Sequence, residues 1–221
     1  MKLSQLKIDP EFQSKIPPLQ FEEEQQLEQN IIAEGRLLNP IITWNGYILD
    51  GHTRYRILKK HGFIKFEVEE IQLANKYEAL AWICKNQLGR RNLSPERKKF
   101  LLGKEYESTK LAVGGQPGNC NKVNRCDQND HIDSEKRTCE RIAVEHGVGS
   151  ATVRRAEKYS RGIDAAEEAV PGAQEEILTG HIKATDEQIV ALASIPKEER
   201  PAILEELKKK KSDRDDTSSN A

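Results

Sequence analysis

The chain is poor in the features that mark secreted and membrane proteins. It has four cysteines in 221 residues, and only 5% of its residues are aromatic. So few cysteines in a chain of this length do not form a dense disulfide framework, and reduced thiols are expected. No apolar run approaches the roughly 18 residues needed to cross a bilayer, and residues 1–9 lack the apolar stretch of a signal peptide. We therefore expect a cytoplasmic protein with no membrane partner.

Charge is distributed unevenly along the chain, although the net charge is −1. Residues 1–89 contain 11 Lys+Arg and 12 Asp+Glu, residues 90–161 contain 16 and 10, and residues 162–221 contain 8 and 14. The middle third, with a balance of +6, is the only candidate surface for a polyanion. A solvated basic face would have the same composition, so charge alone does not decide between the two.

The first 89 residues predict a compact unit of mixed strands and helices. Asn45-Gly46 is a strong two-residue hairpin signal, and it joins apolar runs at residues 40–44 and 47–49. Gly35 follows a helically periodic run and suits the position after a helix end. The other expected elements are strands within residues 3–8 and 63–73 and helices over residues 21–34, 52–61 and 76–87.

The remainder of the chain predicts helices and loops. Ser94 is a good N-cap and Pro95 a good first helical residue for a helix that reaches about residue 111. Residues 114–133 are polar and rich in Gly and Asn, which favours a loop. A break is expected over residues 162–171, before short helices around 172–179, 185–193 and 197–210. The predicted class is α+β, with domains 1–92, 93–162 and 163–207 and a disordered tail over 208–221.

The most specific pattern is a pair of helices joined by a short turn at about residues 137–160. Ile142, Ala143 and Val153 fall on the inner faces, and Gly147 lies where a sharp turn needs a positive φ. Such a pair presents its second helix to the major groove of DNA. A plain helical hairpin with a solvated basic face is the alternative. The expected DNA-binding residues are Ser150, Thr152, Arg154, Arg155 and Lys158.

A second basic cluster lies at the predicted strand-to-helix junction after Asp50. The start of a helix exposes unpaired N–H groups that favour anions, and arginine side chains add charge-assisted bonds to phosphate oxygens. Ordinary surface arginines, with Asp50 as a capping carboxylate, explain the composition equally well. The expected phosphate-binding residues are Gly51, His52, Arg54, Arg56, Arg90 and Arg91.

Together these motifs resemble the ParB/sulfiredoxin superfamily N-terminal domain followed by a helix-turn-helix. They are most similar to ParB-like proteins of phages and mobile elements. The resemblance extends from residue 1 to about residue 205. It rests on Asn39-Pro-Ile-Ile-Thr-Trp44, on Asp50-Gly-His-Thr-Arg-Tyr-Arg-Ile57, on the box from Asn86 to Pro95, and on the helix pair.

The resemblance implies a small mixed ParB/sulfiredoxin-like α/β domain, then an all-α helix-turn-helix domain and short C-terminal helices. It also implies double-stranded DNA as partner, a homodimer, and CTP or another NTP with Mg²⁺ as cofactor. The family's Gly-x-x-Arg-x-Arg phosphate pattern falls on Gly51, Arg54 and Arg56, and its second-box arginine falls on Arg90. Nucleotide-switching relatives have Glu-Arg where this chain has His52-Thr53, which counts against hydrolysis.

Enzymatic and metal-binding functions are weaker interpretations of the same residues. Asp50 is the one obvious acid beside the phosphate motif, and one carboxylate is thin support for phosphoryl chemistry. Sulfiredoxin activity is excluded because the segment from Gly51 to Arg54 contains no cysteine. No metal site is expected, because no Cys-x-x-Cys spacing of the kind that holds structural zinc occurs among Cys120, Cys126, His131 and Cys139.

We therefore expect a ParB-like DNA-binding protein that acts in partition or transcription control of a mobile element and is regulated by a nucleotide. The first alternative is an enzyme, a nuclease or an NTP-dependent phosphotransferase, that uses the same phosphate site with Asp50 as its candidate catalytic residue. The second alternative is an adaptor whose acidic residues 162–221 dock a partner.

Overall fold

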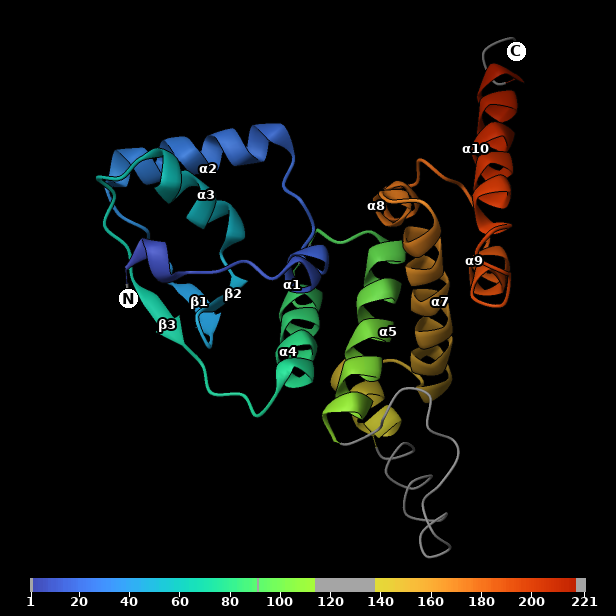
Figure 1. Ribbon diagram of the computed structural model, residues 1–221, viewed down its shortest axis with the longest axis horizontal. Helices are drawn as coiled ribbons and strands as arrows, with labels where there is room; N and C mark the ends of the chain where they lie inside the picture. Colours follow the sequence, from blue (N-terminus) through green and yellow to red (C-terminus); the bar gives the residue numbers. More distant parts are fainter. Residues whose placement is uncertain (1, 91, 114–137, 218–221) are drawn as a thin grey trace, which may run out of the picture. The chain divides into compact units, whose positions relative to one another are not determined.

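The computed structural model describes residues 2–90, 92–113 and 138–217, with side chains described through residue 208. The chain divides into two compact units, Met1–Gln87 and Leu88–Ala221 (Figure 1). Unit 1 mixes strands with helices, and the described part of unit 2 contains helices without strands, so the predicted α+β class is confirmed. Within the described residues, no helix is both long enough and apolar enough to span a membrane.

A three-stranded sheet of order β2-β1-β3 forms the centre of unit 1. β1 (Ile41–Trp44) and β2 (Tyr47–Asp50) are the two strands of the predicted antiparallel hairpin. Asn45 and Gly46 connect them at φ values of 49° and 77°, the backbone conformation that a two-residue hairpin turn requires. β3 (Val68–Glu70) pairs with the other edge of β1 in parallel.

Helices cover both faces of this sheet. One core cluster joins β1 and β2 to α2 and α3 through residues such as Ile31, Ile41 and Ile57. A second cluster joins Leu49 of β2 to Phe12 of α1 and to α4. The helical elements of unit 1 are η1 (Leu3–Gln5), α1 (Pro10–Ser14), α2 (Phe21–Glu34), α3 (His52–Lys60) and α4 (Lys76–Leu88).

The strand expected within residues 3–8 is wrong. Residues 3–5 form a 3-10 turn, in which the side chain of Gln5 accepts a hydrogen bond from the backbone of Lys2 at 2.7 Å. Local bonds of this kind offer the backbone an alternative to a sheet ladder. Only a single bridge, between Lys7 and Tyr47, pairs this segment with the hairpin.

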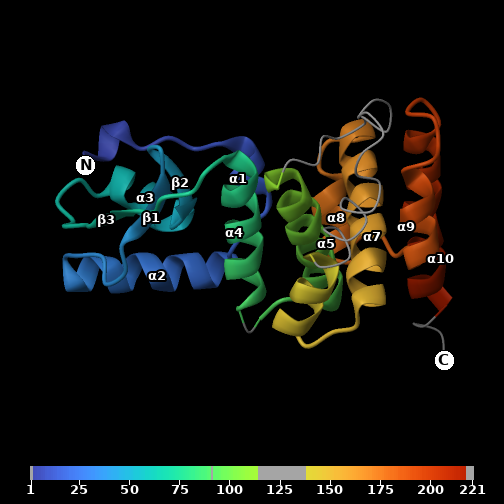
Figure 2. The same ribbon diagram turned by 90° about the horizontal axis from the view of Figure 1, so that it is seen from below.

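Unit 2 is a set of packed helices. Its first helix begins as predicted, because Pro95 takes the first helical position and the Ser94 hydroxyl accepts a hydrogen bond from the Arg97 amide at 3.2 Å. α5 and α7 lie side by side in both views (Figures 1 and 2). The helical segments are α5 (Pro95–Ala112), residues 138–145, α7 (Ser150–Ala169), α8 (Ala173–Leu178), α9 (Asp186–Leu192) and α10 (Arg200–Thr217).

The helix break expected from residue 162 does not occur there, because α7 continues to Ala169. Gly162 lies inside the helix, where a Cβ atom would be 2.0 Å from the carbonyl oxygen of Ile189. The glycine therefore allows α9 to approach the backbone of α7, and a boundary after residue 162 would divide one helix. The chain turns later, at Gly172, which has a φ of 91°.

The C-terminal segment also differs from its prediction. Residues 208–217 belong to α10, whereas the sequence predicted a disordered tail from residue 208. Lys and Arg are good helix formers, and buried Leu204 and Leu207 hold the earlier turns of α10 against the rest of unit 2. Residues 218–221 and the predicted loop 114–133 lie outside the described residues.

Candidate nucleic-acid interface

Two helices joined by a four-residue turn make up the candidate interface. Residues 138–145 form the first helix, residues 146–149 the turn, and α7 the second helix; we call this the helix pair. The amide of His146 donates to the carbonyl of Ile142 at 3.0 Å and closes the first helix. Gly147 then takes a φ of 64°, as the sequence predicted for the turn.

A shared apolar core holds the helix pair against α5. The inward positions predicted from sequence are buried, with Ile142 and Val153 at 1% and 0% exposure. The buried thiol of Cys139 donates to the carbonyl of Ser150 at 3.2 Å, which fixes the start of α7 to the first helix. The core residues are Leu102 and Tyr106 of α5, Cys139, Ile142 and Ala143 of the first helix, and Val153 and Ala156 of α7. α7 is therefore supported along its inner side.

The outer side of α7 carries the predicted DNA-binding residues. Thr152, Arg154, Arg155 and Lys158 are exposed, and Ser150 is half-buried. Among the residues that the structure describes, none forms an ion pair or a hydrogen bond with the side chains of the two arginines or the lysine. Residues three and four apart share a face of a helix, so these side chains form one continuous basic strip.

The start of α7 adds a partial positive charge to that of the basic strip. Gly149 precedes the helix without a side-chain cap, and the first turn contains no acidic residue. The unpaired amides and the aligned peptide dipoles give such a helix end a partial positive charge. An anion at this end is therefore favoured, and a phosphate is the anion that DNA supplies.

In unit 1, the arginine of the phosphate-like motif has partners that sequence analysis missed. The guanidinium of Arg54 donates to the carbonyl oxygens of Asn39 and Pro40, each at 2.9 Å. It also forms an ion pair with Asp50 at 2.6 Å, and both side chains are largely buried. Gly51 stands between them at a φ of 101°. Arg54 therefore connects the loop before β1 to the end of β2.

His52 and Arg56 have opposite environments in the same motif. His52 is 6% exposed, and within the described residues neither of its ring nitrogens has a hydrogen-bond partner. Burial lowers the pKa of His52 from 6.5 to about 4, so the ring is neutral at pH 7. Arg56 is exposed, and its guanidinium lies 3.1 Å from a carboxylate oxygen of Glu24. Arg56 is therefore the more accessible arginine of the motif.

Arg90, which was expected at the same phosphate site, belongs to the other unit. Arg90 is exposed and lies at the start of unit 2, whereas the motif from Gly51 to Arg56 lies in unit 1. Arg91 lies outside the described residues, as do Cys120, Cys126 and His131.

Sequence reasoning also missed a polar contact between the turn of the helix pair and α5. Nε2 of His146, in the turn, lies 2.7 Å from Oε2 of Glu105, whose side chain is 5% exposed. The contact ties the turn to α5. The only sequence signal for it is an acidic residue inside an otherwise apolar stripe of α5, next to Leu101 and Leu102.

Comparison with known proteins gives likenesses among solved structures alone. The sequence matches none of the family models and none of the curated proteins with which it was compared. Among solved structures, it is similar to a Pnob8-like ParB-N domain solved in a C2221 crystal form. The identity is 14% and the TM-score 0.49, over 94% of this chain and 95% of that chain. The function proposed below rests on the residues of this chain and not on that likeness.

Proposed function

We propose that the protein binds double-stranded DNA through the outer side of α7, as a helix-turn-helix does. The observation that carries this proposal is the strip of Arg154, Arg155 and Lys158, exposed and without partners in the described chain. A strip of unpaired cations beside an uncapped helix start is suited to the phosphates of a duplex, and arginine is also suited to the edge of guanine. The supporting core holds this strip on a regular helix rather than on a loop.

The sequence resemblance to ParB-like proteins extends the proposal to a biological role. A protein of this kind binds a centromere-like or operator site and acts in partition or in transcription control of a mobile element. It does so as a homodimer, because a two-fold protein matches a palindromic site. Sedimentation of the purified chain, with and without a selected duplex, tests the dimer directly.

DNA binding is tested with Arg154→Ala combined with Arg155→Ala. The wild-type chain first selects duplexes from a random pool, and fluorescence anisotropy then gives Kd for the selected duplex. We expect the double variant to bind at least about tenfold more weakly, because two charge-assisted contacts are lost. Lys59→Ala combined with Lys60→Ala removes the same charge from the exposed end of α3 and is the control. Unchanged affinity in the arginine variant would refute the proposal.

Phosphate or nucleotide binding at the start of α3 is the second candidate function. Two observations favour it: α3 begins at Gly51 without a side-chain cap, and buried His52 has both ring nitrogens unpartnered in the described chain. Calorimetry with CTP, ATP and GTP, each with Mg²⁺ and with or without DNA, tests it. A heat of nucleotide binding that disappears in Arg56→Ala supports the site. The absence of binding heat with all three nucleotides rejects it.

An enzymatic role would use the same site. Asp50 is the candidate acid, yet its carboxylate already accepts a hydrogen bond from the guanidinium of Arg54 at 2.6 Å. A nuclease or NTP hydrolase that depends on Asp50 would lose turnover in Asp50→Asn while keeping nucleotide affinity. The absence of any DNA cleavage or NTP hydrolysis by the wild-type chain would end this alternative.

A further inference from the structure

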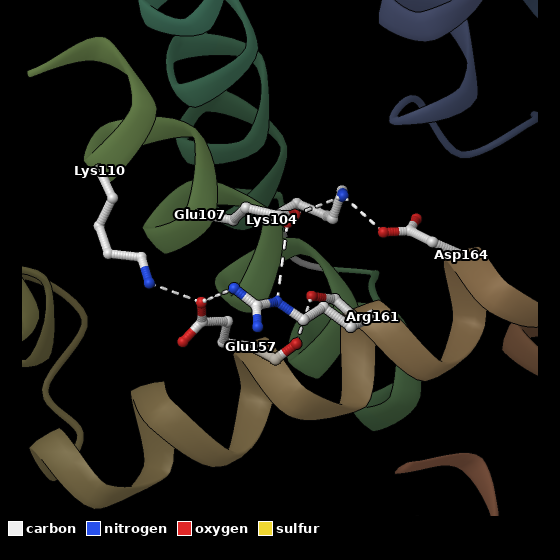
Figure 3. Close-up of polar contacts among 7 residues, drawn as sticks. Lys104, Glu107, Lys110, Glu157, Arg161 and Asp164 are labelled. Atoms are coloured by element: carbon white, nitrogen blue, oxygen red, sulfur yellow. Dashed lines mark hydrogen bonds and ion pairs between the residues drawn. The ribbon is translucent and has the colours of Figure 1, made fainter. Parts of the chain in front are cut away.

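Three pairs of opposite charges connect α5 to α7 (Figure 3). Lys104 lies 2.7 Å from Asp164, Glu107 lies 3.8 Å from Arg161, and Lys110 lies 2.7 Å from Glu157. Bonds within each helix join the pairs, from Lys104 to Glu107 at 2.6 Å and from Arg161 to Glu157 at 2.8 Å. We call these six residues the charge ladder.

The ladder has an antiparallel register and alternating polarity. Its α5 members are spaced three residues apart, and each step forward along α5 meets a residue one turn earlier on α7. Along α5 the signs are plus, minus, plus. Along α7, from Glu157 to Asp164, they are minus, plus, minus. Every rung therefore joins opposite charges in this register.

The two outer rungs are partly shielded from solvent, whereas the Arg161 side chain of the middle rung is 54% exposed. The side chains of Lys104, Lys110 and Glu157 are 13%, 17% and 12% exposed. Although burial opposes a charge, Asp164 and Glu107 raise the pKa of Lys104 above its usual value. Shielding of this kind reduces screening by salt and strengthens the two outer rungs.

The helices also meet backbone to backbone. A Cβ atom on Gly103 would lie 2.2 Å from the carbonyl oxygen of Ala156. Such a crossing sets how near the helices lie and already disfavours a slip, because the α5 residues one turn away all carry a Cβ atom. The ladder adds an electrostatic discrimination between registers. A slip of α7 by one turn brings Arg161 beside Lys104 or Lys110, and brings Glu107 beside Glu157 or Asp164.

We propose that the charge ladder fixes the axial register of α7 on α5 and thereby positions the basic strip for DNA. This inference rests on the proposed DNA binding. One helical turn is a shift of about 5.4 Å, which exceeds the spacing of about 3.4 Å between successive nucleotides of one strand. A slipped α7 would present Arg154 and Lys158 to the wrong phosphates and base edges. The six ladder side chains are thus positioning residues, and none of them needs to contact DNA.

The test inverts the ladder by halves. The half-inverted variant carries Glu157→Lys, Arg161→Glu and Asp164→Lys, so every rung joins like charges. The fully inverted variant adds Lys104→Glu, Glu107→Lys and Lys110→Glu, so every rung joins opposite charges again. The half-inverted variant gains two units of positive charge. Its control is Glu140→Lys, which gains the same charge at an exposed position of the first helix.

Thermal unfolding and DNA affinity are measured on the full chain for all four proteins. We expect the half-inverted variant to lose about 5 °C or more in Tm and, at a temperature where it is still folded, to bind the selected duplex at least about tenfold more weakly. Extra positive charge alone would tighten binding, as Glu140→Lys is expected to do. The fully inverted variant should recover most of both losses.

Several outcomes would overturn the inference. Binding by the half-inverted variant as tight as that of Glu140→Lys would show that register does not matter for DNA. A fully inverted variant no better than the half-inverted one would show that the pairing of signs is irrelevant. If the half-inverted chain does not fold, recovery of wild-type Tm and affinity by the fully inverted chain decides the matter. Failure of the wild-type chain to bind DNA would refute the proposed function. The Tm comparison would still show whether the ladder stabilises the packing of α7 on α5.

Discussion

Arginines of similar sequence context have very different surroundings in this protein. Arg54 is surrounded by two backbone carbonyls and a carboxylate, so much of its donor capacity is already used within the fold. Arg56, two residues later, is exposed beside Glu24. Arg154 and Arg155 project from α7 with no partner in the described chain. A basic motif therefore identifies a candidate site, but the contacts of each residue decide its role.

At this scale, Arg54→Lys tests the structural role of Arg54. A lysine cannot reproduce the planar set of donors that meets Asn39, Pro40 and Asp50 together, so we expect the free energy of unfolding to fall by about 1–3 kcal/mol. Urea unfolding measures the change. Arg56→Lys is the matched control, and it should alter stability by less than about 0.5 kcal/mol. Equal effects of the two substitutions would contradict the assigned role.

His52 predicts a dependence of stability on pH. Its pKa is lowered from 6.5 to about 4 by burial, so between these values the unfolded chain binds a proton that the folded chain does not. The contribution of a neutral His52 is therefore complete above pH 6.5 and is lost as the pH falls towards 4. The slope is at most about 1.4 kcal/mol per pH unit.

Replacing His52 with leucine should remove this part of the pH dependence. Both ring nitrogens lack partners in the described chain, so an apolar side chain leaves no hydrogen bond unmade. Urea unfolding at pH 7 and pH 5 should show a smaller difference for His52→Leu than for the wild type. His181→Leu, at an exposed position, should keep the wild-type difference. Parallel pH curves for the wild type and His52→Leu would be evidence against a buried neutral imidazole.

At the scale of elements, two glycines inside helices mark close backbone contacts. Gly103 of α5 faces Ala156, and Gly162 of α7 faces Ile189. An added Cβ atom would lie 2.2 Å and 2.0 Å, respectively, from the carbonyl oxygens of these residues. Glycine lowers the intrinsic stability of a helix interior, so here the contact outweighs propensity. The residue that resembles a helix breaker in the sequence is the one that lets helices pack.

Gly103→Ala should therefore destabilise the protein despite the higher helix propensity of alanine. The two nearest obstructing atoms belong to the backbone of Ala156, so the helices must move apart, and we expect a loss of about 2–4 kcal/mol in the free energy of unfolding. Gly62→Ala, where no atom lies within 4 Å of the added carbon, should change stability little. A stabilised Gly103→Ala chain would mean that the two helices are not in contact there.

Sequence analysis succeeded where structure is decided by neighbouring residues. The turn at Asn45-Gly46 and the helix start at Ser94-Pro95 depend on local backbone preferences, and both are found as predicted. It failed where remote partners decide. Gly162 was interpreted as a break because Ile189 is 27 positions away, and Arg54 was assigned to phosphate because backbone carbonyls at residues 39–40 leave no signal in the side-chain pattern.

The candidate interface shows the same division. Burial of Ile142 and Val153 and exposure of the basic strip follow from helical periodicity, and both are confirmed. The DNA-binding role itself stays a prediction. The charge ladder was missed, although neighbouring members are three or four residues apart along each of two helices, because periodicity within one helix does not say which helix it faces.

At the scale of the whole molecule, some of the 16 cations of residues 90–161 are already paired within the fold. Lys104, Lys110 and Arg161 form ion pairs within the ladder. Contact through the three cations of the strip alone gives a slope of log K against log salt concentration of about −2.7 per bound protomer. A slope near −5.4 would indicate that about three further cations also meet phosphates. Anisotropy titrations from 50 to 300 mM salt (roughly the useful range) separate the two.

The shielding of Lys104 has a chemical consequence. An acylating reagent reacts with an amine that is accessible and transiently deprotonated, and a lysine that is 13% exposed and held between two carboxylates meets neither condition. Lys158 meets the first, since it is exposed. Brief acylation of the native protein should therefore modify Lys158 and spare Lys104, as peptide mass mapping would reveal. A bound duplex should then protect Lys158 and leave the reactivity of Lys104 as it was.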